Sequence, residues 1–189
     1  MTQFKRPLIG TLVFCLVTAL LAARVYAADI PAYDGTSETP GMSPTARAEV
    51  PLDRPNIEVT ALLPWLADTA TAAYSLDADT YKDTLKKASA NFTTDGWKDF
   101  TSILARNDVI NQVTNKGMVV SLTTGTPILL SEGIKEDNKY QWTITMPATI
   151  SYVESKDERR ELTTINVTIV RVPLNDNLLG IQILNWTQT

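Results

Sequence analysis

Histidine and cysteine, two residue types that often catalyse reactions and bind transition metals, are nearly absent from this chain. It contains no histidine, which excludes Ser-His-Asp and Cys-His mechanisms and imidazole metal sites. The single cysteine, Cys15, lies in an apolar run near the N-terminus, and the scattered glycines form neither GxGxxG nor GxxxxGK. The residue types therefore provide no nucleophile–base pair and no phosphate-binding loop.

The carboxylates Asp77, Asp79 and Asp83 form the one close acidic group that we considered as a metal site. A hard-cation site needs several oxygens converging from a loop with a glycine turn, and this stretch has no such glycine. We interpret the three residues as negative charge at the start of a helix, where it complements the helix dipole.

Nine aromatic residues could line a ligand-binding cone, or they could form an ordinary core. They are Trp65, Tyr74, Tyr81, Phe92, Trp97, Phe100, Tyr140, Trp142 and Tyr152. Large aromatic side chains on apolar stripes are more often core, and an acid–base enzyme would need an acid among them. The inward positions of the long strand predicted over Tyr140–Tyr152 carry no acid, which argues against an enzyme.

The longest strand is predicted from Tyr140 to Tyr152, where every even position is apolar or aromatic and the odd positions other than Pro147 are polar. This period of two is typical of a strand with one buried face. Pro147 lies on its polar side and has no N–H for a ladder bond, so we expect a bulge or bend at Met146-Pro147.

Helices are predicted before this strand and further strands after it. The apolar spacing predicts helices over Pro64–Leu76, Asp79–Phe92 and Asp95–Arg106, the last capped by Thr94 or Thr93, with Asn56 a possible cap for the first. A short helical turn is expected over 108–115. The charged run Glu154–Glu161 is expected to be a solvated hairpin loop, and the closing strand to span Leu178–Trp186. The fold class is therefore α+β, with three helices against a curved four-stranded antiparallel sheet.

The sequence of the N-terminal third predicts that the protein is exported from the cytoplasm. Residues 1–27 combine Lys5 and Arg6, the apolar run Leu8–Ala23 and a cleavage site after Ala27, which is typical of a signal peptide; an uncleaved anchor is the alternative. Cleavage removes three of the 17 basic residues and none of the 21 acidic ones, so the net charge falls from −4 to −7. Such an acidic chain is not expected to bind nucleic acid, and without its cysteine it forms no disulfide. Residues 28–56 form a proline-rich linker, and residues 57–189 form one folded domain.

Within that domain several blocks resemble the DotI/IcmL family, which is related to TraM. The most specific block is FTTDGWKDF, from Phe92 to Phe100, followed by Tyr140–Ile144, Met146-Pro147 and Val170–Pro173. The motif and core positions are Trp65, Tyr74, Tyr81, Phe92, Gly96, Trp97, Phe100, Trp142, Pro147, Arg171 and Pro173.

The resemblance implies a nuclear-transport-factor-two-like cone in the periplasm and a non-enzymatic role in a type IVB secretion system. It further implies contacts with other secretion-complex proteins and with copies of itself, without a cofactor or small-molecule substrate. Family members typically carry a cytoplasmic tail and a membrane helix, whereas here the apolar run begins near residue 8. The chain is therefore expected to be either the inner-membrane subunit or a free periplasmic paralogue. A ligand-binding or isomerase-like protein and a secreted protein that reuses the fold are the alternatives.

Overall fold

The computed structural model describes residues 50–189, which belong to a single compact unit. The predicted signal peptide and linker residues 28–49 lie outside the described residues. Within 50–189 no helix is both long and apolar enough to cross a membrane.

Four helices precede the sheet. They are α1 (Val59–Ala73), α2 (Tyr81–Ser89), α3 (Thr94–Arg106) and α4 (Val109–Lys116). The Thr93 hydroxyl accepts the Gly96 N–H at 3.1 Å, so Thr93 is the cap of α3. The predicted Asn56 cap is wrong, because α1 begins after Glu58 and the Asn56 amide donates instead to the Leu179 carbonyl at 2.6 Å. Pro64 lies inside α1.

Five antiparallel strands form one sheet that is four strands wide. They are β1 (Val119–Thr124), β2 (Ile128–Ile134), β3 (Tyr140–Glu154), β4 (Asp157–Arg171) and β5 (Ile181–Gln188). The order is β1-β3-β4-β5, and β2 also pairs with β3, beyond the end of β1. The predicted α+β class is therefore confirmed. Strands β1 and β2 follow one another along the same side of β3 and together form one edge of the sheet. The closing strand begins at Ile181, so Leu178 and Leu179 lie in the loop before it.

Pro147 interrupts the edge of the sheet and leaves the central pairing unbroken. It lies opposite Thr164 of β4 without a register shift, so the expected bulge does not occur in the β3–β4 ladder. The interruption falls on the other side of β3, between β1 and β2, where the Gly125 N–H donates to the Pro147 carbonyl at 2.7 Å. The physical reason is that proline lacks the N–H that would be needed on this side, so the edge partner leaves the ladder here.

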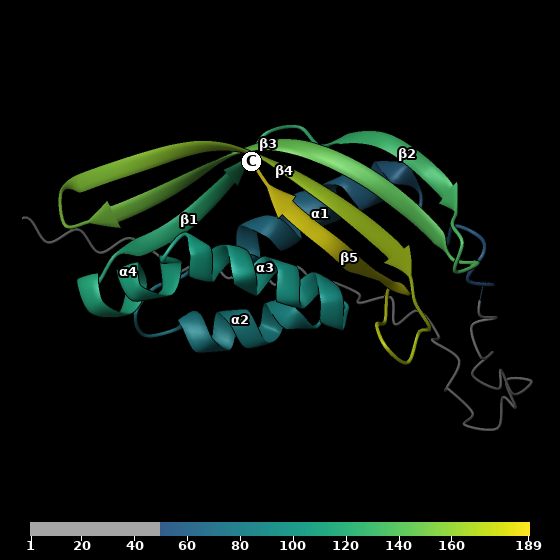
Figure 1. Cartoon of the computed structure of the whole chain (residues 1–189), viewed down its shortest axis with the longest axis horizontal. Helices are drawn as coiled ribbons and strands as arrows, with labels where there is room; N and C mark the ends of the chain where they lie inside the picture. Colours follow the sequence, from purple (N-terminus) through teal and green to yellow (C-terminus); the bar gives the residue numbers. More distant parts are fainter. Residues whose placement is uncertain (1–49) are drawn as a thin grey trace, which may run out of the picture. The chain divides into compact units, whose positions relative to one another are not determined.

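The prediction of a solvated loop over Glu154–Glu161 is wrong. Strand β3 continues to Glu154 and β4 begins at Asp157, so only Ser155 and Lys156 form the turn of a long projecting hairpin (Figure 1). Oppositely charged neighbours on each face stabilise the strand here: Arg160 pairs with Glu158 at 2.7 Å and Arg159 with Glu161 at 2.5 Å. Both pairs are exposed, so each contributes at most about 1 kcal/mol.

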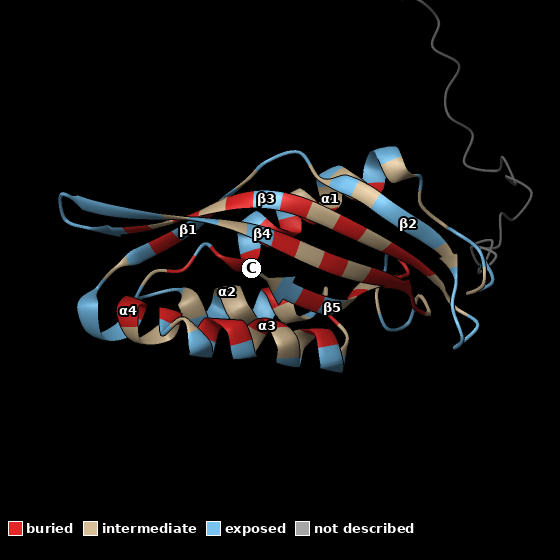
Figure 2. Ribbon diagram, turned by 45° about the horizontal axis from the view of Figure 1, so that its top comes forward, coloured by how far each residue is buried: buried red, intermediate tan, exposed pale blue. Residues whose placement is uncertain are grey.

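The helices cover one face of the arched sheet (Figure 1). On β3 the even-numbered side chains face these helices and are buried, among them Trp142, Ile144, Met146 and Ile150. The odd-numbered ones are largely half-exposed, which produces the alternating bands along β3 and β4 in Figure 2. The period of two in the sequence therefore corresponds to one covered and one uncovered face.

Candidate functional site

An aromatic cluster fills the space between α3 and the sheet. Phe100 is central, with ring centroids 5.4 Å from Tyr74, 5.2 Å from Phe92 and 5.4 Å from Trp186. Trp97 closes the cluster, at 5.5 Å from Phe92. All but the half-buried Trp97 are at most 4% exposed. Edge-to-face contacts at these distances are typical of a packed interior.

Trp186 is the member of this cluster that our sequence interpretation did not include. The strand prediction covered it, but a β-bulge between Thr168 and Ile169 shifts the register of β5 on β4. Its inward direction depends on that shift, because Ile183 and Trp186 are both buried although they are an odd number of positions, three, apart. A strict alternation places one of them outside, so periodicity alone could not identify both.

The other predicted positions are distributed around the domain. Trp142 is fully buried and contacts Tyr140 at 5.0 Å, while Trp65 and Tyr81 are partly buried against the core. Pro147 is exposed on the uncovered face of the sheet. The structure therefore unites the Phe92–Phe100 block with Tyr74 and leaves the remaining positions in separate environments.

Gly96 permits the close approach of α3 to β5. A β-carbon at this position would overlap the Ile183 carbonyl oxygen and lie 3.1 Å from the Leu184 carbonyl carbon. Since the obstacles are backbone atoms, no side-chain rotation could relieve the overlap. The FTTDGW block thus combines a cap, a close contact and an aromatic anchor within one helical turn.

In the part of the chain that the structure describes, the titratable groups with shifted pKa values near the interior are tyrosines. The Tyr74 hydroxyl donates to Gln188 at 2.8 Å, and burial, with a contribution from Tyr152, holds the pKa of Tyr74 well above its usual range. Burial and then the Glu161 carboxylate raise the pKa of Tyr152 to about 12, although the Arg159 guanidinium 4.2 Å from its ring acts in the opposite direction. Both phenols are therefore protonated at neutral pH and cannot act as bases.

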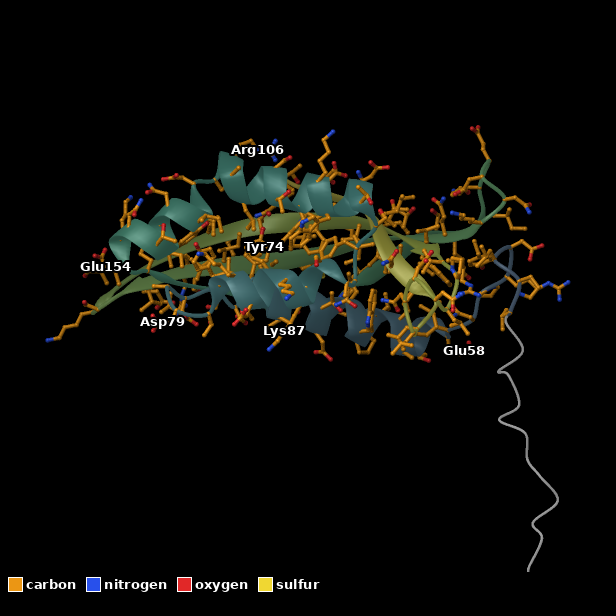
Figure 3. The ribbon with its side chains drawn as sticks, turned by 90° about the horizontal axis from the view of Figure 1, so that it is seen from below. Glu58, Tyr74, Asp79, Lys87, Arg106 and Glu154 are labelled. Atoms are coloured by element: carbon orange, nitrogen blue, oxygen red, sulfur yellow. The ribbon has the colours of Figure 1, made fainter. Side chains whose placement is uncertain are left out.

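Charged side chains lie at the periphery. In Figure 3, Tyr74 lies between the helices and the sheet, whereas Glu58, Asp79, Lys87 and Arg106 lie around the outside. The Thr80 hydroxyl donates to the Asp77 carboxylate and is the main cause of its lowered pKa; the N–H groups of Thr80 and Asp79, both at 2.9 Å, add to this effect. Among residues 50–189, no group of acidic side chains is arranged to hold a metal ion.

Among residues 50–189, Arg171 is the one buried cation, and it holds the start of the domain to the end of the sheet. Its guanidinium donates to the carbonyls of Val50 at 2.7 Å, Arg54 at 3.0 Å and Gly180. Gly180 has φ +67°, and a β-carbon there would meet the guanidinium, so this position requires glycine. Pro173 follows, half-buried, in the turn that leads to Gly180. The last residues of the predicted linker are thus fastened to the folded domain.

Exposed apolar side chains mark the surfaces that could contact other proteins. Three lie on β2 (Ile128, Leu130, Ile134), two in the β4–β5 loop (Leu178, Leu179), two on the projecting hairpin (Val153, Leu162), one at the start of β1 (Val119) and one at the first described residue (Val50). One open depression has a volume of about 540 Å³ and is lined largely by threonines around Pro147. It lacks the convergent polar groups of a ligand site. The arrangement favours contacts through surfaces over chemistry in a pocket.

Comparison with known proteins identifies the family. The sequence model for the type-IV b secretion system inner-membrane complex component DotI/IcmL matches residues 15–189. This chain belongs to the DotI/IcmL family. Comparison with curated proteins gave no match.

Solved structures of DotI/IcmL relatives share the fold. The periplasmic domain of DotI is 27% identical, with a TM-score of 0.66 over 70% of this chain and 96% of that domain. A periplasmic fragment of TraM reaches 0.66 at 19% identity, over 69% of this chain and 96% of the fragment. An IcmL-like type IV secretion system protein from Legionella pneumophila reaches 0.61 at 19% identity, over 70% of this chain and 93% of that protein. The predicted nuclear-transport-factor-two-like fold is confirmed, and the family is one of secretion-complex components with periplasmic domains.

Proposed function

We propose that this protein is a non-enzymatic periplasmic component of a type IVB secretion system that acts through protein–protein contacts. Membership of the DotI/IcmL family supports the secretion-complex assignment. The observation that carries the non-enzymatic role is the filled interior, where Phe100, Trp142 and Ile144 are fully buried between the helices and β3. Export by the predicted signal peptide or anchor would place residues 57–189 in the periplasm, behind a proline-rich linker.

The geometry gives less support to the two alternatives. An isomerase-like enzyme would need an acid or base facing a cavity, and the buried titratable groups near the interior are tyrosines that remain protonated at neutral pH. A secreted protein that reuses the fold makes a different prediction about location. Cell fractionation distinguishes it, because our proposal expects the protein in the periplasm or envelope and none in the culture medium.

The direct test combines a deletion with isolation of the secretion complex from the native host. We expect the protein to co-purify with inner-membrane components of the complex, and deletion to abolish translocation of a reporter substrate. A complementing wild-type copy should restore translocation. Absence from the complex, together with normal translocation after deletion, would refute the proposal.

A further inference from the structure

The outer edge of β2 presents backbone groups that have no partner among the described residues. The Lys135 N–H donates to the Lys139 carbonyl at 3.1 Å, so the backbone N–H and C=O groups of Lys135 point toward β3. The same register continues through Gly133 opposite Gln141 and Ser131 opposite Thr143. Because ladder bonds alternate along an antiparallel strand, Gly133 and Ser131 also point toward β3. The N–H and C=O groups of Glu132 and Ile134 therefore point outward, and no hydrogen bond to them is formed within 50–189.

Three of the exposed side chains of this edge are apolar. Ile128, Leu130 and Ile134 are 56%, 60% and 56% exposed, and Glu132 is the only charged residue of β2. Soluble proteins normally protect such an edge with charges, prolines or a covering segment. Figure 2 shows β2 as a largely exposed strand at the border of the sheet.

The other borders of the sheet are protected. Val120 of β1 exchanges two backbone bonds with Leu76, at 2.8 and 2.9 Å, and Ile183 of β5 bonds to Asn91 and Thr93 at 2.8 and 2.9 Å. The projecting part of β4 carries the charged run Asp157–Glu161. Among the described residues, β1 and the projecting part of β4 each carry one exposed apolar side chain, Val119 and Leu162, whereas β2 carries three beside its outward backbone groups.

Charge at this edge indicates what kind of segment would fit. A groove of about 340 Å³ lies between the start of α1 and the β2–β3 pair, and its lining includes Val50, Glu58, Glu132 and Tyr140. It contains two carboxylates and no basic side chain, and neither carboxylate forms an ion pair with a described residue. An incoming lysine or arginine would supply the missing opposite charge.

We propose that the edge of β2 binds an extended segment of another secretion-complex protein as an added strand. Its backbone pairs with Glu132 and Ile134, its apolar side chains cover Leu130 and the flanking isoleucines, and one basic side chain approaches Glu58 and Glu132. This is β-strand addition, in which main-chain bonds supply affinity and side chains supply specificity. The inference rests on the proposed function, because it takes the partner to be a component of the same complex.

The test uses the full chain, purified from its host, and synthetic peptides in which valine alternates with threonine around a central lysine or a central glutamate. Fluorescence anisotropy measures binding, and amide chemical shifts locate it. We expect the lysine peptide to bind about tenfold more tightly than the glutamate peptide, and the shifts to fall on β2. Glu132→Pro removes one outward N–H at a position where an edge strand tolerates proline, and should weaken binding about tenfold. Glu132→Gln should keep binding but reduce the preference for lysine.

Leu130→Lys provides a second variant that leaves the backbone unchanged and should also weaken binding, whereas Leu162→Lys, on the projecting hairpin, should have no effect. Equal binding of both peptides, shifts on another border, or unchanged binding by Glu132→Pro and Leu130→Lys would overturn the proposal. A dimer in sedimentation that Glu132→Pro dissociates would overturn it as well, since the occupant would be a second copy. If deletion stops translocation while Glu132→Pro and Leu130→Lys do not, the proposed function stands and the edge inference fails.

Discussion

Substitution of Gly96 by alanine tests the packing of α3 against β5. Alanine is the better helix former by about 1 kcal/mol, so an unobstructed site would become more stable. Here the new methyl group overlaps the Ile183 carbonyl oxygen, which also accepts the Thr93 N–H at 2.9 Å. Either α3 or β5 must move, and overpacking of this kind costs about 1–3 kcal/mol. Because relief of the overlap also disturbs the Thr93 bond, we expect a net loss of about 1–3 kcal/mol.

Chemical denaturation of the purified protein measures this loss as a lower midpoint at an unchanged slope. Ser102→Ala, on the exposed side of the same helix, is the control, and it should change stability by less than about 0.5 kcal/mol. An increase in stability for Gly96→Ala would show that helix propensity outweighs the contact, and that α3 and β5 are not packed as closely as described.

Three further changes test other parts of the structure. Trp142→Ala should lower the free energy of unfolding by about 3–5 kcal/mol because the indole is fully buried. Trp142→Phe should cost less than about 2 kcal/mol, since it also removes an indole N–H that has no described hydrogen-bond partner. Equal losses for the two variants would contradict this reasoning. Arg171→Lys should lower the midpoint and speed limited proteolysis near Arg54, because an ammonium group cannot reproduce the guanidinium's bonds to several carbonyls; unchanged cleavage would refute the clamp. The raised pKa of Tyr152, about 12, predicts stability that is complete below the ordinary phenol pKa near 10 and is lost as the pH rises through 12. Tyr152→Phe should flatten that part of the alkaline stability curve, and an identical decline in both proteins would show that Tyr152 does not contribute.

The local parts of the fold could be predicted from the sequence because each depends on neighbouring residues. The alternation from Tyr140 to Tyr152 identified the buried face of β3, since a strand repeats every two residues. Thr93 could be identified as a cap because its hydroxyl reaches an N–H only three residues later. Gly96 was marked by the same block, but its reason, the backbone of β5, lies almost ninety residues farther along the chain.

The features that escaped prediction depend on distant contacts. The charged run Asp157–Glu161 is polar enough for a loop, yet pairing with β3 and the contact of Arg159 with Gln112 at 2.9 Å extend the strand. Arg171 was marked through the resemblance alone, and its role depends on carbonyls more than a hundred residues away. The exposed side chains of β2 are apolar in sequence, so only the three-dimensional position of β2 at an uncovered border distinguishes them from core.

The Arg171 clamp and the β2 edge are physically connected through the first described residues. Arg171 binds the carbonyl of Val50, and the Val50 side chain lines the groove that also contains Glu58 and Glu132. The Tyr140 N–H donates to the Leu52 carbonyl at 2.7 Å, which fastens the same segment to the start of β3. Loosening the clamp should therefore alter the groove as well as the start of the domain, so Arg171→Lys should weaken binding of the lysine peptide although it lies outside β2. Phe100→Leu, which disturbs the fully buried core under α3, away from this segment and from β2, should leave peptide binding unchanged. Equal effects of the two variants would show that general stability, and not the clamp, controls the edge.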